Sequence, residues 1–265
     1  MIAAPADIAP APVLRVQGVH KSYSERAAVE DVSFDLYAGE VLAVVGESGS
    51  GKTTLLNCVS ARLKPDAGRV EFLTRHEGVV DIYALSEAQR RLLARTDWGY
   101  VHQNAAEGLR MNVSAGANVG ERLMALGERH YGKLRQVSAD WLARVEMDAQ
   151  RMDDTPQTFS GGMRQRLQIA RNLVTQPRLV FMDEPTSGLD VSVQAKLLDL
   201  LRSLTRQLSL AAIIVTHDLA VARLLAHRML VMKGGRMVET GLTDQVLDDP
   251  QHPYTQLLVS SVLQP

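Results

Sequence analysis

A glycine-rich segment at residues 46–53 has the residue types and spacing most suggestive of chemistry. It follows an apolar run at residues 41–45 and leads into a helical pattern that begins near Lys52. Glycines let the backbone curl until successive N–H groups point inward, and a helix N-terminus adds partial positive charge, so the segment suits phosphate oxygens. The residues predicted to contact a nucleotide are Gly46, Glu47, Ser48, Gly49, Ser50, Gly51, Lys52, Thr53 and Thr54.

Within this loop, Lys52 is predicted to reach the β- and γ-phosphates of a nucleotide, and the Thr53 hydroxyl is predicted to ligate Mg²⁺. A glycine-rich turn that binds nothing is the alternative interpretation. By itself the loop would suit a kinase, a GTPase or a motor equally well.

Two adjacent carboxylates end another apolar run, at residues 179–184. Ligands bind at the carboxyl ends of parallel strands, so Asp183 is predicted to hold Mg²⁺, directly or through water. Glu184, one residue further, is predicted to polarise an attacking water as a general base. A pair of surface carboxylates is the alternative, which a phosphate-binding loop in the same chain disfavours.

The elements that must position these residues follow from the pattern of apolar side chains. Continuous apolar runs at residues 41–45, 179–182 and 211–215 predict strands buried on both faces, and helical segments between them indicate a parallel α/β sheet. Residues 13–19 and 32–36 predict strands with one exposed face, and residues 228–240 predict two short strands around Gly234. Residues 81–175 show a helical pattern, with a capping box at Ser86 and Gln89.

The composition is that of an ordinary soluble globular protein, which we expect to be cytoplasmic. The 265 residues are 46 % apolar and 22 % charged, and the net charge of -1 gives no sign of a nucleic-acid binder. No apolar run approaches the length that spans a bilayer, so no direct membrane insertion is expected, and residues 1–12 are expected to be a flexible lead-in. Cys58, the single cysteine, is predicted to be a buried core residue.

Further segments resemble the ATP-binding-cassette (ABC) ATPase family. Residues 159–165 resemble its signature sequence, with Phe159 and Met163 in place of the usual leucine and glutamine. Gln103 fits the family's Q-loop glutamine, and residues 187–190 fit its D-loop. The resemblance implies an α/β fold with a RecA-like parallel-sheet core, an N-terminal antiparallel β subdomain and an inserted α-helical subdomain at about 85–175. All of these belong to one ATPase domain at residues 13–265.

The same resemblance assigns roles to further residues. Ser160, Gly161 and Gly162 would cap the γ-phosphate of ATP bound to an opposing subunit, so that ATP joins two cassettes as a homodimer or as a pair with a related cassette. Gln103 would sense Mg²⁺, and His217 would be catalytic near the γ-phosphate. Tyr23 would stack on adenine, and Asp190 would belong to the nucleotide-binding set.

A closer resemblance covers nearly the entire chain. Residues 60–63, 120–125, 129–132, 241–244 and 252–264 look like those of the ABC-type ATPase subunit of bacterial carbon–phosphorus lyase systems, which break down alkylphosphonates. It implies that the chain docks on the lyase core complex, against the subunit with radical iron–sulfur chemistry, without cleaving the carbon–phosphorus bond itself. A single cysteine agrees, because it cannot hold an iron–sulfur cluster.

Two alternatives stay open. Residues 252–255 resemble the tail of oligopeptide- and nickel-type importer ATPases. A nucleic-acid-directed ABC ATPase is the second, although no long coiled-coil or zinc insert interrupts residues 103–160. The helical segment from Gln103 to about Gly132 is the expected docking surface. There Met111, Met124 and Leu126 either contact a partner or fill the subdomain's own core.

Overall fold

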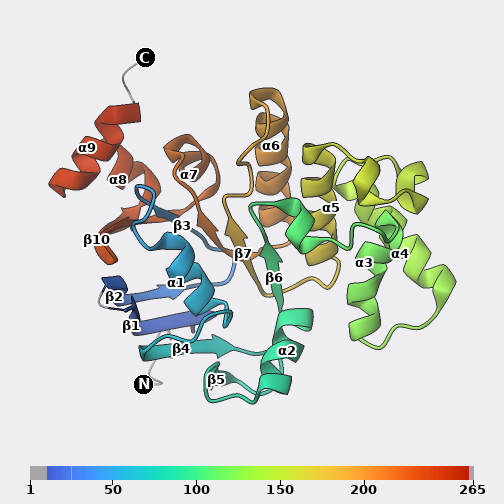
Figure 1. Ribbon diagram of the computed structural model, residues 1–265, viewed down its shortest axis with the longest axis horizontal. Coiled ribbons are helices and arrows are strands. Elements are labelled where there is room, and N and C mark those ends of the chain that lie inside the picture. Colours follow the sequence, from blue (N-terminus) through green and yellow to red (C-terminus); the bar gives the residue numbers. More distant parts are fainter. Residues whose placement is uncertain (1–10, 25, 263–265) are drawn as a thin grey trace, which may run out of the picture.

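The computed structural model describes residues 11–24 and 26–262, and it contains two β-sheets with helices around them (Figure 1). The expected flexible segment at residues 1–12 therefore lies almost wholly outside the described residues. The smaller sheet consists of β1 (Leu14–Tyr23), β2 (Arg26–Leu36), β4 (Ala67–Leu73) and β5 (Val79–Asp81). Its strands are antiparallel, in the order β2-β1-β4-β5. The alternating patterns predict strands at β1 and β2, and the antiparallel arrangement is the one that the resemblance to the ABC family implies.

The larger sheet is the predicted parallel one. Its strands are β3 (Val41–Val45), β6 (Trp98–Val101), β7 (Leu179–Asp183), β8 (Ala211–Val215), β9 (Arg228–Lys233) and β10 (Arg236–Leu242). They lie in the order β10-β9-β3-β8-β7-β6, and only the pairing of β10 with β9 is antiparallel. β3 and β8 are buried at every residue, which explains their unbroken apolar sequences. The α/β architecture expected from the sequence is confirmed.

Helices cover both sheets and extend to one side of the larger sheet (Figure 1). The α-helices are α1 (Lys52–Val59), α2 (Glu87–Thr96), α3 (Ala115–Ala125), α4 (Tyr131–Arg144), α5 (Gly161–Leu173), α6 (Val191–Gln207), α7 (Leu219–Leu225), α8 (Thr243–Asp248) and α9 (Pro253–Val262). Short 3₁₀ helices are η1 (Ala105–Gly108), η2 (Ala149–Asp153) and η3 (Pro156–Thr158). The predicted capping box is present at the start of α2, where Ser86 and Gln89 bond reciprocally.

One expectation about the helical segment needs correction. Residues 81–175 are not helical throughout, because β6 lies within them and pairs with β7 as the edge strand of the larger sheet. The pattern concealed it, since a four-residue apolar run looks the same in a buried helix as in a strand. Within α2, Leu92 is 55 % exposed, whereas Leu93 is buried.

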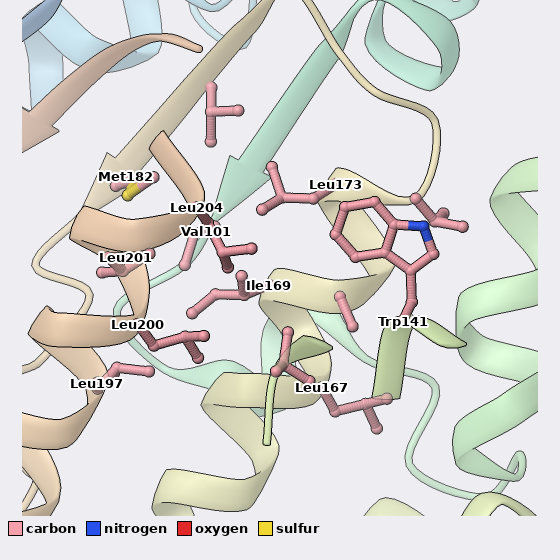
Figure 2. Close-up of a cluster of buried hydrophobic side chains, with 14 of the residues drawn as sticks. Val101, Trp141, Leu167, Ile169, Leu173, Met182, Leu197, Leu200, Leu201 and Leu204 are labelled. Atoms are coloured by element: carbon pink, nitrogen blue, oxygen red, sulfur yellow. The ribbon is translucent and has the colours of Figure 1, made fainter. Parts of the chain in front are cut away.

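α5 joins the group of helices to the larger sheet. Figure 2 shows Leu167, Ile169 and Leu173 of α5 among side chains from β6, β7, α4 and α6, including Trp141 and Leu204. A second cluster packs α1 between the two sheets and includes Cys58, which is buried as predicted. Among the described residues, none of the helices combines the length and the apolarity that a membrane crossing demands.

Candidate nucleotide-binding site

The glycine-rich loop connects the end of β3 to the start of α1, as its sequence predicts. Gly46 and Gly51 have φ angles of 148° and 102°, which are unfavourable for any residue with a Cβ. A Cβ would also lie 2.2 Å from the Met232 carbonyl oxygen at the first position and 2.1 Å from the Ala28 carbonyl oxygen at the second. Both glycines are therefore required for the loop to curl against its neighbours.

Lys52 folds back over this loop. Its ammonium donates to the carbonyl oxygens of Gly46 at 2.9 Å and Glu47 at 2.8 Å, and the side chain is almost fully buried. Burial lowers the pKa of Lys52, and the nearby carboxylates of Glu184 and Asp183 oppose that effect. The loop therefore holds a cation in position, ready to bond to phosphate oxygens.

The two predicted carboxylates lie next to the loop. The Thr53 hydroxyl donates to Asp183 Oδ1 at 3.3 Å, which brings together the two oxygen groups predicted to hold Mg²⁺. Burial raises the pKa of Asp183, and the Glu184 carboxylate adds to the rise, while the Thr53 hydrogen bond and Lys52 counteract it. A hydroxyl and one or two carboxylates, completed by substrate phosphates, are a donor set that Mg²⁺ prefers.

Glu184 pairs with His217. The distance from Glu184 Oε2 to His217 Nδ1 is 2.8 Å, and the two residues follow the neighbouring parallel strands β7 and β8. Glu184 has a φ of 43°, and its N–H donates to the Val215 carbonyl at 2.9 Å. The His217 side chain is 64 % exposed, whereas the Glu184 side chain is 18 % exposed, so the imidazole faces solvent at the rim.

A cavity of about 790 Å³ gathers most of the predicted residues. Its lining includes Tyr23, Ser48, Gly49, Gly51, Lys52, Thr53, Thr54, Gln103, Glu184 and His217. It also includes Arg26, Ala28, Ser187 and Gly234, which sequence reasoning did not assign to the site. Arg26 adds a cation beside the loop, and Gln103 donates from Nε2 to Ser187 Oγ at 3.1 Å, so the predicted Q-loop and D-loop touch each other.

The predicted signature residues lie apart from this cavity. Ser160, Gly161 and Gly162 form the start of α5, where Ser160 Oγ accepts the Met163 N–H at 3.3 Å. Asp190 precedes α6 without a side-chain cap bond, and Gly46, Glu47 and Ser50 belong to the loop but are not among the lining residues. The structure therefore assembles the loop, the carboxylates and His217, but not the signature.

A contact from the end of the chain was not predicted. The N–H of Glu47 donates to the hydroxyl oxygen of Tyr254 at 3.0 Å. Tyr254 belongs to α9 and is 7 % exposed, and the Lys233 ammonium lies 4.7 Å from the centre of its ring. The two bonded residues are 207 positions apart, so no local pattern could have indicated the contact.

Comparison with known proteins is consistent with this geometry. The family model described as ABC transporter matches residues 29–187, and the model described as oligopeptide/dipeptide transporter, C-terminal region, matches residues 238–265. PhnK of Escherichia coli (strain K12), named for phosphonates utilization and ATP binding, is 64 % identical over 96 % of this chain and 98 % of its own length. The dipeptide transport ATP-binding protein DppD of Bacillus subtilis (strain 168) is 35 % identical over 94 % of this chain and 76 % of its own.

Solved structures agree with the sequence relatives. An ATP-binding cassette in a dimeric post-hydrolysis state, bound to ADP and Pi, superposes with a TM-score of 0.77 at 27 % identity and covers 87 % of this chain and 98 % of its own. The cassette cbiO1 of Clostridium perfringens superposes with a TM-score of 0.78 at 27 % identity, over 90 % and 92 % of the two chains. The loop, the sheet and these likenesses together show that the chain belongs to the ATP-binding-cassette (ABC) family of ATPases.

Proposed function

We propose that this ABC ATPase docks on a carbon–phosphorus lyase core complex and couples its ATP cycle to the breakdown of alkylphosphonates. The observation that supports this most directly is the 64 % identity, over nearly the whole of both chains, with a relative named for phosphonates utilization. The peptide-transport relative is much more distant, at 35 % identity. In this proposal the chain works in the cytoplasm as the energy-supplying subunit, while the core complex performs the bond cleavage.

The residues of the cavity have distinct roles in the proposed ATP hydrolysis. Lys52 and the loop N–H groups bind the phosphates, and Tyr23 and Arg26 line the same cavity beside them. Thr53 and Asp183 would hold Mg²⁺, which would supply positive charge to offset the negative charge of the transferred phosphoryl group. Glu184 accepts a proton from the attacking water, and His217, paired with it at 2.8 Å, holds that carboxylate in place.

A second cassette completes the site. Ser160, Gly161 and Gly162 lie outside the chain's own cavity, although they present the free N–H groups of a helix start. Facing a second copy or a related cassette, they would close its ATP site, and Asp190 would lie at the same junction. The dimeric cassette bound to ADP and Pi is a solved structure of a similar chain in such a pair.

The docking surface of the proposal lies on the helices that follow Gln103. Met124 is 45 % exposed and Leu126 is 52 % exposed, so both are available to a partner. Met111, in contrast, packs against the core cluster that contains Trp141. Met111 therefore fills the chain's own core, whereas Met124 and Leu126 face outward.

An importer subunit is the second candidate function. The match of residues 238–265 to the oligopeptide/dipeptide transporter C-terminal region favours it. In this alternative the same exposed surface would bind a membrane permease instead of a soluble enzyme. The two functions therefore differ in the partner, and both use the same ATP site.

Replacing Glu184 with glutamine tests the ATP site. The variant Glu184→Gln keeps the side chain's size but removes its basicity, so turnover should fall by about 10²–10⁴-fold while ATP stays bound. Steady-state phosphate release and retention of labelled ATP measure the two effects. Undiminished hydrolysis in this variant would refute the assignment of the general base.

Affinity capture tests the partner. The tagged protein, recovered from phosphate-starved cells, should bring down the subunits of a soluble lyase complex. The variant Met124→Glu/Leu126→Glu should lose them while keeping its ATPase activity, because both side chains are exposed and lie outside the cavity. Recovery of integral membrane permeases alone would replace the proposed function with the importer alternative.

A further inference from the structure

The outer edge of β6 is paired by side chains of α5 instead of by another strand. Asn172 Oδ1 accepts the Tyr100 N–H at 3.0 Å, and Asn172 Nδ2 donates to the Tyr100 carbonyl at 2.9 Å. One step along, Gln168 Oε1 accepts the His102 N–H at 2.6 Å, and Gln168 Nε2 donates to the His102 carbonyl at 3.2 Å. Each amide therefore imitates the donor and acceptor pair of a neighbouring strand.

The spacing of the two amides explains why this works. Residues two apart on a strand are separated by about 6.6 Å, and residues four apart on a helix are separated by about 6 Å. The distance from Tyr100 to His102 is therefore close to the distance from Asn172 to Gln168, which lie on one face of α5. The two amides are also nearly inaccessible, at 5 % and 0 % exposure. Gln165, 3 % exposed, adds a third amide, because its Nε2 donates to the His102 carbonyl at 3.3 Å.

Gln168 contacts both ends of the segment that contains Gln103. It holds the backbone of His102 on one side, and Gly108, the last residue of η1, on the other. A Cβ at position 108 would lie 2.2 Å from Gln168 Oε1, so the 3₁₀ turn rests directly on the amide. The segment from 102 to 108 is thus anchored at its start and its end by one buried side chain of α5.

We propose that Gln168 is a positioning residue that makes the Gln103 segment and α5 move as one body, so that ATP binding in the chain's own cavity is transmitted to Ser160–Gly162. Gln103 lines that cavity, and α5 begins at the signature residues that the proposed function assigns to the opposing ATP site. The inference rests on that proposed function. It adds a mechanical link between the two parts of ATP sites that one chain carries, namely its own cavity and the residues Ser160–Gly162.

Hydrogen exchange in a hydrolysis-deficient background tests the link without turnover. In Glu184→Gln, kept dilute enough to stay monomeric so that no opposing ATP touches Ser160–Gly162, ATP should slow exchange in three places: the loop at 46–54, the segment at 102–108 and the first turn of α5. In Glu184→Gln/Gln168→Leu, the apolar side chain can hold neither backbone group of His102. ATP should then slow exchange in the loop alone, and the effects on the other two segments should be lost.

Asn172→Leu is the matched control in the same background. It also removes a buried amide from α5, but the backbone groups that lose their partner are those of Tyr100, which is further from Gln103. Its melting temperature should fall as much as that of Gln168→Leu, while all three ATP effects persist. A merely structural role for Gln168 predicts instead that both variants behave alike.

The inference can also be tested by a variant that disturbs the contact between Gln168 and His102 without altering Gln168 itself. Gly108→Ala should push the amide away from His102 and reproduce the loss, whereas Gly120→Ala, whose new Cβ would have no neighbour closer than 3.5 Å, should not. ATP effects in the first turn of α5 that survive both Gln168→Leu and Gly108→Ala would overturn the inference. If ATP left even the loop at 46–54 unprotected in the parent, the proposed nucleotide site itself would fail, which is a separate outcome.

Discussion

Lys52 shows at the scale of a single residue how the chain prepares its site. Its buried ammonium is held by two carbonyl oxygens of its own loop, at 2.8 and 2.9 Å. These neutral acceptors only partly offset the cost of burial, and the pKa of Lys52 is lowered as a result. A phosphate oxygen in their place would bring a full negative charge to the ammonium, which neutral carbonyl oxygens cannot supply. The Lys52 ammonium is therefore expected to bind a phosphate more favourably than it binds the two carbonyl oxygens of its own loop.

Cys58 lies near the carboxyl end of α1, the helix that follows the phosphate loop, and its thiol can report on the opening of that helix. It is fully buried, and burial raises the pKa of its thiol to about 11, so at pH 8 it is neither accessible nor ionised. We expect it to react with a thiol reagent only when α1 opens, and ATP should slow that reaction because ligand binding stabilises the closed state. Absorbance of the released chromophore measures the rate, and denatured protein, which should give one thiol per chain, is the control. Rapid labelling unaffected by ATP would contradict the prediction.

Local sequence predicted the site wherever one segment supplied the chemistry. The phosphate loop and the two carboxylates could be identified because each follows a buried strand, and parallel strands bring such ends together. His217 also follows such a strand, but its role came only from the resemblance to the ABC family. Arg26 and Tyr254 were missed for the opposite reason. Their contribution depends on how β2 and α9 pack against the loop, and such long-range packing leaves no local signal.

At the scale of elements, α5 connects the sheet to the signature residues, and its packing against α6 depends on Gly162. A Cβ at this position would lie 2.5 Å from Val193 Cγ1, a branched side chain that has little freedom to move. The glycine therefore has a packing role that is separate from its proposed contact with phosphate.

A pair of substitutions separates those two roles. Gly162→Ala should destabilise the chain by about 1–3 kcal/mol, the usual cost of overpacking, and adding Val193→Ala should restore much of the loss. Urea unfolding measures the stability, with Val193→Ala alone as the control. If the double variant regains stability yet still fails to pair with a second cassette, Gly162 also acts at the phosphate. No recovery in the double variant would contradict the packing role.

β6 marks the limit of element prediction from the sequence. Its four residues, Trp98–Val101, are too few to show a strand period, and they follow directly on a well-capped helix. What makes them a strand is pairing with β7 on one side and the amides of α5 on the other. Longer elements such as α6, with apolar residues repeated over several turns, could be predicted from their sequence alone.

At the scale of the whole molecule, the phosphate loop is held from several distant parts of the chain. Ala28 and Met232 crowd its glycines, and Tyr254 accepts the N–H of Glu47. The sequence predicted the sheet that carries the loop but not these supports. They come from β2, β9 and α9, which are brought together only in the folded chain.

Tyr254→Phe tests the support from α9. The ring would still fill its pocket, but the Glu47 N–H would lose its acceptor, so stability should fall by about 1 kcal/mol and ATP should bind more weakly. Thermal unfolding and calorimetric titration with ATP measure the two effects. Tyr131→Phe, at a tyrosine that is 70 % exposed, should change neither. Unchanged ATP affinity in Tyr254→Phe would show that the hydrogen bond does not shape the loop.

The contact between Glu47 and Tyr254 also has a consequence for synthesis. Glu47 is synthesised 207 residues before Tyr254, an interval of roughly 10–40 s at common bacterial elongation rates. During that time the growing chain carries the complete phosphate-binding sequence without the side chain that supports it. Full affinity for ATP would then arise only after Tyr254 has been made and α9 has packed against the loop, so a shorter nascent chain would bind nucleotide more weakly.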